Sequence, residues 1–159
     1  MMVKLLRILA LSLLLSANVY ASENEFPLDS AITYGKLENG FTYYIRENQT
    51  PKDKVSIKLI IKAGSIMEEE NQLGLAHLLE HMAFNGSKNF PKRKIDEYMS
   101  SIGLNLGSHY NATTGFLETS YDYEIPTKND KDVEVALKIL TDISKNLSFE
   151  PEAFERERK

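Results

Sequence analysis

Residues 55–86, VSIKLIIKAGSIMEEENQLGLAHLLEHMAFNG, decide the fold of this chain. Residues 55–63 alternate between apolar and polar side chains and then become almost continuously apolar, as a strand does when one face and then both are covered. Carboxylates and an asparagine follow, and they favour a helix N-terminus because they complement unpaired amides and the positive end of the helix dipole. The segment therefore predicts a strand and then a helix over residues 72–84, closed by Asn85 and Gly86.

The rest of the chain continues this mixture of strands and helices. Asn39-Gly40 lies between two stretches rich in aromatic and β-branched residues, which is typical of a tight hairpin. Residues 116–125 predict another strand. Apolar residues at helical spacing, or a proline suited to a first turn, predict helices over residues 91–102, 130–147 and from Pro151 onward. We expect an α+β two-layer sandwich, with a mostly antiparallel sheet and helices on one face.

The N-terminus has the features of a secretory signal peptide. Two basic residues precede an uninterrupted apolar run over residues 8–15, and residues 19–21 place small side chains at the cleavage-determining positions. We expect a leader of residues 1–21 and a mature chain of residues 22–159. The alternative is an uncleaved leader acting as a membrane anchor, although the apolar run is shorter than the roughly 20 residues of a spanning helix. The bacterial style of the leader favours a periplasmic location.

Composition restricts the chemistry that the mature chain can perform. Removal of the leader takes away two of the 19 basic residues and none of the 23 acidic ones, so the net charge changes from −4 to −6. Such an acidic domain is a poor candidate for binding nucleic acid. The chain has no cysteine, which excludes disulfides, a thiol nucleophile and thiolate metal ligands. A transition metal would have to be held by His, Asp or Glu.

Two of the three histidines fall on one turn of the predicted helix. Each helical residue advances about 100° and 1.5 Å, so His77 and His81 lie on one face with Glu80 beside them. Both imidazoles can reach one zinc ion, which in a catalytic site takes three protein ligands and a water. Glu80 can then accept a proton from the water that the ion activates, and H-x-x-E-H is the inverted form of a known zinc-peptidase motif.

The same pattern has a purely structural interpretation. A histidine pair at this spacing can flank an ordinary core helix in which apolar neighbours do the packing. The five residues of the motif leave the two interpretations open.

Four segments resemble the pitrilysin (insulinase) family of zinc metallopeptidases. They are LENGFTYYIREN (37–48), IKLIIKAGSIMEEENQLGLAH (57–77), GLAHLLEHMAFNGSKNFP (74–91) and YNATTGFLETSYDYEIP (110–126). The resemblance covers nearly all of the mature chain in order. It implies that His77 and His81 are zinc ligands, that Glu80 is the base, and that Asn111 and Ala112 begin an edge strand that binds substrate backbone.

The resemblance also implies parts that this chain does not contain. The family's third zinc ligand is a glutamate on a helix whose beginning resembles FERERK, and it would fall beyond Lys159. Glu150, Glu152, Glu155 and Glu157 remain possible substitutes for this ligand, but none of them matches the expected place. The family also uses a second homologous half, so a second half or homologous subunit is an expected partner.

We therefore expect the N-terminal portion of an exported zinc endopeptidase, truncated at its C-terminal end, whose substrates are extended peptides or unfolded proteins. The alternative is a non-catalytic fragment or interaction subunit that lacks the third ligand and the second half.

Overall fold

The structure, a computed structural model, describes residues 27–158, and the chain divides into two compact units, residues 1–49 and 50–159. The predicted signal peptide, residues 1–21, lies outside the described residues. Within residues 27–158, no helix combines the length and apolar character needed to cross a membrane.

The described part of the first unit is a β-hairpin. Strands β1 (Ile32–Lys36) and β2 (Thr42–Arg46) pair in antiparallel register, with Lys36 opposite Thr42. Gly40 lies in the turn with a φ of 86°, a value that glycine adopts readily. The Leu37 amide donates to the Phe41 carbonyl at 2.8 Å, so the loop holds three residues, one more than the tightest Asn-Gly turn. The predicted hairpin is confirmed with this longer loop.

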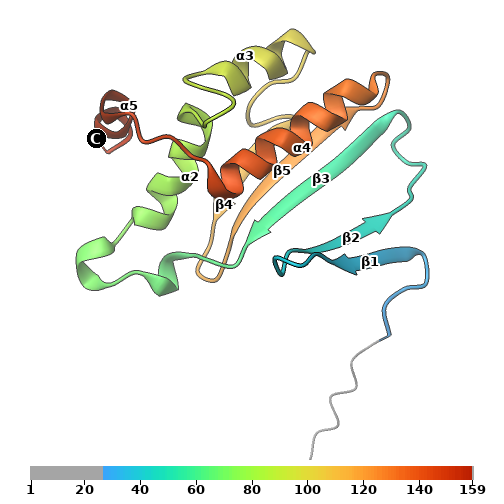
Figure 1. Cartoon of the computed structure of the whole chain (residues 1–159), viewed down its shortest axis with the longest axis horizontal. Coiled ribbons are helices and arrows are strands. Elements are labelled where there is room, and N and C mark those ends of the chain that lie inside the picture. Colours follow the sequence, from blue (N-terminus) through green and yellow to red (C-terminus); the bar gives the residue numbers. More distant parts are fainter. Residues whose placement is uncertain (1–26, 159) are drawn as a thin grey trace, which may run out of the picture. The chain divides into compact units, whose positions relative to one another are not determined.

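The second unit contains an antiparallel sheet and four α-helices (Figure 1). The sheet has the order β3-β5-β4, and helix α4 packs on it through contacts with β3 and β5. The elements are β3 (Lys54–Ile61), α2 (Leu75–Asn85), α3 (Lys94–Ser101), β4 (Tyr110–Thr114), β5 (Thr119–Pro126), α4 (Asp130–Lys145) and α5 (Pro151–Glu157), with two 3₁₀ turns, η1 (Ser65–Met67) and η2 (Glu70–Gln72). The expected α+β class with antiparallel sheets is confirmed.

The central strand β5 supplies much of the core. Tyr121, Tyr123 and Ile125 alternate along it and are almost completely buried, as are Ile139 and Ile143 on α4. Alternate strand residues share one face of a sheet, so this row faces the helical layer. Burial of these side chains against α4 fixes β5, and with it the neighbouring strand β4, in the fold.

Three predicted starts are wrong for local reasons, those of α2, α3 and β5. Helix α3 begins at Lys94 instead of residue 91, because a turn precedes it in which the Lys94 amide donates to the Pro91 carbonyl. Helix α2 begins at Leu75 instead of residue 72, because the Glu68 carboxylate accepts hydrogen bonds from the Gly74 and Ala76 amides, both at 2.8 Å. Strand β5 begins at Thr119 instead of residue 116, because a turn follows β4, in which the Gly115 amide donates to the Glu118 carbonyl. In each of these places a turn forms where the pattern predicted the first residues of a helix or strand.

The Glu68 cap predicts a pH-dependent contribution to stability. Hydrogen bonds from the Ala76 and Gly74 amides hold the pKa of Glu68 below its ordinary value of 4.5. A carboxyl whose pKa is lowered by folding stabilises the protein above its unfolded pKa and loses that contribution as pH falls through the folded value. We expect the unfolding temperature of wild type to exceed that of Glu68→Gln at pH 7, and the difference to shrink below about pH 4.5. The measurement is thermal unfolding by circular dichroism at each pH.

Glu70→Gln is the control, because Glu70 is exposed in η2 of the same segment. A difference between wild type and Glu68→Gln that stays constant from pH 7 to pH 3 would contradict the cap's role.

Asp142 on α4 fastens the loop that follows α2. It is only 1 % exposed and accepts four hydrogen bonds of 2.7–2.9 Å. Burial acts to raise the pKa of Asp142, but hydrogen bonds from Ser87, Asn146 and Asn89 outweigh it and hold that pKa below its ordinary value. The carboxylate therefore fixes the end of α2 to the helical layer.

We expect Asp142→Ala to destabilise the chain by about 3 kcal/mol, because it leaves buried donors without an acceptor. Urea unfolding measures this free energy. Glu134→Ala, at an exposed position on the same helix, is the control and should change stability little. A loss equal to that of the control would show that the loop is fastened by other contacts.

Candidate metal and catalytic site

His77 and His81 lie together on the exposed side of α2. Their Nε2 atoms are 3.1 Å apart, and their ring centroids are 4.5 Å apart with the rings nearly perpendicular. The four-residue spacing produces this arrangement, since it places both side chains on one helical face. The Nε2 atoms thus converge on one point.

The pair has suitable geometry for zinc. A tetrahedral ion with Zn–N bonds of about 2.0–2.1 Å separates two ligand nitrogens by about 3.3–3.4 Å. The observed separation of 3.1 Å is close to this value, so a small rotation of either ring would admit the ion. Within residues 27–158, no third His, Cys, Asp or Glu joins the pair in a group that could hold a metal. The roles of His77 and His81 as ligands stay predictions.

Glu80 lies on the inward side of the same turn. It is 8 % exposed, and its Oε2 atom accepts a hydrogen bond of 2.6 Å from the Thr114 hydroxyl on β4. Among the described residues, no hydrogen bond to the other carboxylate oxygen, Oε1, is present. One oxygen is therefore held by the sheet while the other is available to accept a proton.

Two cavities meet at Glu80. The smaller, of about 380 Å³, is lined by His77, Glu80 and Ala112 among others. The larger, of about 1110 Å³, is lined by Glu80, His81 and Asn111 among others. The fold therefore brings Asn111 and Ala112, predicted to bind substrate, beside the predicted base and ligands. Their strand, β4, is an edge of the sheet among the described strands, because it pairs with β5 alone.

Glu157 on α5 contacts the site from behind His81. Its Oε2 lies 3.1 Å from His81 Nδ1, the nitrogen that does not face His77. Hydrogen bonds from His81 and Asn85 hold the pKa of Glu157 below its ordinary value. Glu157 is thus placed to orient His81. It contacts Nδ1, whereas a third ligand would have to lie near the converging Nε2 atoms.

Two of these contacts could not be predicted from the sequence. Thr114 belongs to the quoted segment 110–126, but nothing in the sequence indicated that its hydroxyl reaches Glu80. The sequence indicates Glu157 only as a possible substitute for the third ligand. Both contacts join residues far apart in the chain, and only the packing of α2 against β4 and α5 creates them.

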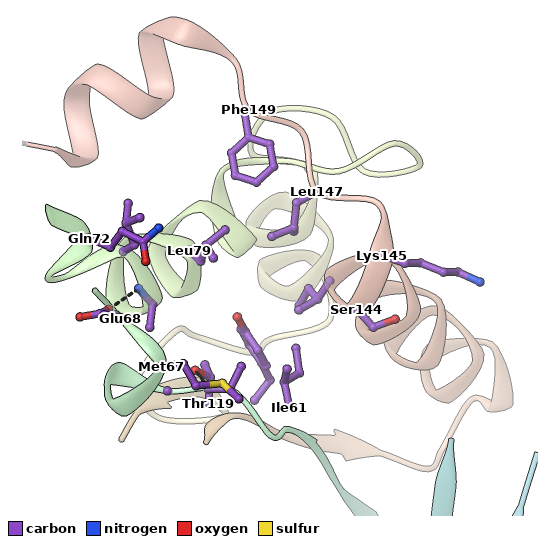
Figure 2. Close-up of a pocket in the computed structure, with 16 residues that line it drawn as sticks. Ile61, Met67, Glu68, Gln72, Leu79, Thr119, Ser144, Lys145, Leu147 and Phe149 are labelled. Atoms are coloured by element: carbon purple, nitrogen blue, oxygen red, sulfur yellow. Dashed lines mark hydrogen bonds between the residues drawn. The ribbon is translucent and has the colours of Figure 1, made fainter. Parts of the chain in front are cut away.

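A third cavity lies beside α2, away from the histidine pair. It measures about 470 Å³ and is mostly apolar. Figure 2 shows Leu79 on α2, and Leu147 and Phe149 from the segment after α4, gathered around it. Its lining contains neither histidine of the pair.

The exposed imidazole pair, the carboxylate of Glu80 beside it and the adjacent edge strand are part of what an inverted-motif zinc peptidase needs, and the third ligand is not among the described residues. Residues 43–159 match the insulinase family, peptidase family M16, and the chain belongs to that family. The predicted membership is confirmed.

The relatives give the comparison more detail. The chain is 38 % identical over 135 residues to the probable zinc protease PqqL of Haemophilus influenzae, covering 85 % of this chain and 15 % of that one. It is 37 % identical over 150 residues to PqqL of Escherichia coli, covering 94 % and 16 %. The crystal structure of the periplasmic protease PqqL from Escherichia coli superposes with a TM-score of 0.80 at 39 % identity, covering 83 % and 15 %. The chain therefore spans about one-sixth of these relatives.

Proposed function

We propose that this chain is the first part of a zinc endopeptidase that cleaves extended or unfolded polypeptides. The observation that carries the proposal is the Nε2 separation of 3.1 Å between His77 and His81 on the same turn as buried Glu80. The relatives support it, since two of them are named probable zinc proteases. The periplasmic location of the Escherichia coli protease and the predicted leader support export to the periplasm.

His77 and His81 would hold zinc through Nε2. The ion would supply Lewis-acid polarisation of a water molecule and of the scissile carbonyl. Glu80 accepts the proton from the attacking water on its free oxygen, while the Thr114 hydroxyl holds the other oxygen and fixes the carboxylate plane. The proton then passes from Glu80 to the leaving amine.

The edge strand β4 is proposed to bind the substrate backbone. An extended peptide can add to an exposed sheet edge as a further strand, using main-chain hydrogen bonds that do not depend on sequence. Asn111 and Ala112 line the two cavities that meet at Glu80, so a peptide along this edge would pass the base. Such binding favours unfolded substrates, because only these expose an extended backbone.

A non-catalytic role is the second candidate. Residues 27–158 contribute two imidazoles and no third convergent ligand. Two imidazoles with water hold zinc more weakly than three protein ligands do, since the site lacks a charged donor. A second peptidase half or homologous subunit that supplies the missing group would restore the first candidate, and a solved first half of the Escherichia coli protease is consistent with a two-part protein.

The test compares this chain with a form extended past Lys159 by the sequence that follows it in its gene. Zinc content and hydrolysis of an unfolded, fluorescently quenched polypeptide are measured for both. We expect the extended form to hold zinc stoichiometrically and to cleave, and the 159-residue chain to do neither efficiently. Failure of both forms to bind zinc would overturn the proposed function.

A further inference from the structure

Asn85, the last residue of α2, joins that helix to α5 through its side-chain amide. Its Nδ2 donates to the His81 carbonyl at 3.1 Å and to Glu157 Oε1 at 3.0 Å. Its Oδ1 accepts a hydrogen bond from the Arg156 guanidinium. The neighbours present two acceptors on one side and a donor on the other, which fixes the orientation of the amide.

The same carboxylate that Asn85 binds also contacts His81. Glu157 Oε1 accepts a hydrogen bond from the Asn85 side chain, and Glu157 Oε2 lies 3.1 Å from His81 Nδ1. The Glu157 side chain is 23 % exposed, so these oxygens are partly shielded from water. Oε1 is held by the hydrogen bond from Asn85 and by an ion pair with Arg156, whose Nε lies 3.6 Å away, and these contacts together set the position of Oε2.

This contact decides which nitrogen of His81 carries hydrogen. An ionised carboxylate only accepts, so Nδ1 must donate to Glu157, and neutral His81 then keeps a lone pair on Nε2. That lone pair points toward His77 Nε2, the place where the two rings converge. Partners of the second ring nitrogen generally set the tautomer of a metal-binding histidine in this way.

We propose that Asn85 is a positioning residue that acts through Glu157 to hold His81 as the Nδ1–H tautomer, with Nε2 presented for a metal. The use of this tautomer rests on the proposed zinc site. The tautomer itself is a property of the metal-free chain. Asn85 makes no hydrogen bond to either converging nitrogen, and its contact with His81 is to the backbone carbonyl, so its effect on the ring is expected to act through the carboxylate.

A purely structural role for Asn85 would have other consequences. If the amide only fastened α5 to α2, its removal would lower stability and leave the ring nitrogens of His81 unchanged. The tautomer of His81 is therefore the discriminating measurement.

The experiment uses the metal-free, ¹⁵N-labelled 159-residue chain in mildly alkaline buffer. Two-bond ¹H–¹⁵N correlation spectra identify the protonated nitrogen of each ring. In wild type we expect His81 to be protonated at Nδ1. In Asn85→Leu and the isosteric Asn85→Asp, we expect the population to shift toward Nε2–H, the form that free imidazole side chains favour. Asn71→Asp, the same charge change at an exposed position, is the control.

A second background tests whether Asn85 acts through Glu157. We expect Asn85→Leu to change the tautomer in the wild-type background and to add nothing in Glu157→Ala. Zinc affinity, measured by chelator competition in the extended form, should fall about 10–100-fold in Asn85→Leu. An unchanged tautomer in both folded Asn85 variants, or an equal effect in the Glu157→Ala background, would overturn the inference. Absence of zinc binding in the wild-type extended form as well would instead count against the proposed function, since the tautomer is read without metal.

Discussion

Glu80→Gln is expected to retain zinc and to lose hydrolysis by about 10²–10⁴-fold in kcat/KM, the usual contribution of a positioned general base. Glutamine keeps the shape of the side chain and can still accept from the Thr114 hydroxyl, which lies 2.6 Å from Glu80 Oε2. It cannot take a proton from water. The measurement pairs zinc content with peptide hydrolysis in the extended protein described above.

Glu118→Gln provides the matched control, because it makes the same chemical change at an exposed residue in the turn before β5. We expect it to cleave at the wild-type rate. Hydrolysis retained by Glu80→Gln would remove Glu80 from the role of base. Loss of zinc in that variant would instead indicate that the carboxylate supports the metal site.

Replacement of either His77 or His81 should greatly weaken zinc binding. We expect His77→Ala and His81→Ala each to weaken zinc binding by about 100-fold or more, since a four-ligand structural zinc site is worth about 10–16 kcal/mol and each ligand accounts for roughly a quarter. Competition with a chromophoric chelator measures the zinc affinity of each variant in the extended protein. Loss of one imidazole leaves a single nitrogen at a place where two converge within 3.1 Å.

His109→Ala is the natural control, because it removes the third histidine of the chain. His109 Nδ1 accepts a hydrogen bond of 3.2 Å from the Asn105 amide, a local contact within its own loop. We expect zinc affinity to be unchanged in this variant. Equal losses in all three alanine variants would show that zinc binds nonspecifically to histidine, and the site would have to be sought elsewhere.

The elements of the fold could be predicted more reliably than their limits. The hydrophobic patterns correctly predicted β3, α2, α4 and the antiparallel sheet, because periodicity is set by which face of an element is buried. The predicted start of α2 was wrong because several acidic side chains precede the helix and any of them could cap its N-terminus. Which one does so depends on the path of the backbone through Gly74, where φ is 91°. The sequence shows which acidic residues could cap α2, and the folded loop places Glu68 where its carboxylate does so.

The convergence of His77 and His81 follows from the sequence alone, because a four-residue spacing brings two side chains onto one face of a helix with 3.6 residues per turn. Family membership follows from the sequence as well, through four segments in order. The surroundings of those side chains depend on tertiary packing. Thr114 reaches Glu80 across 34 residues and Glu157 reaches His81 across 76. Contacts at such separations follow from how α2 packs on β4 and α5, which no local pattern records.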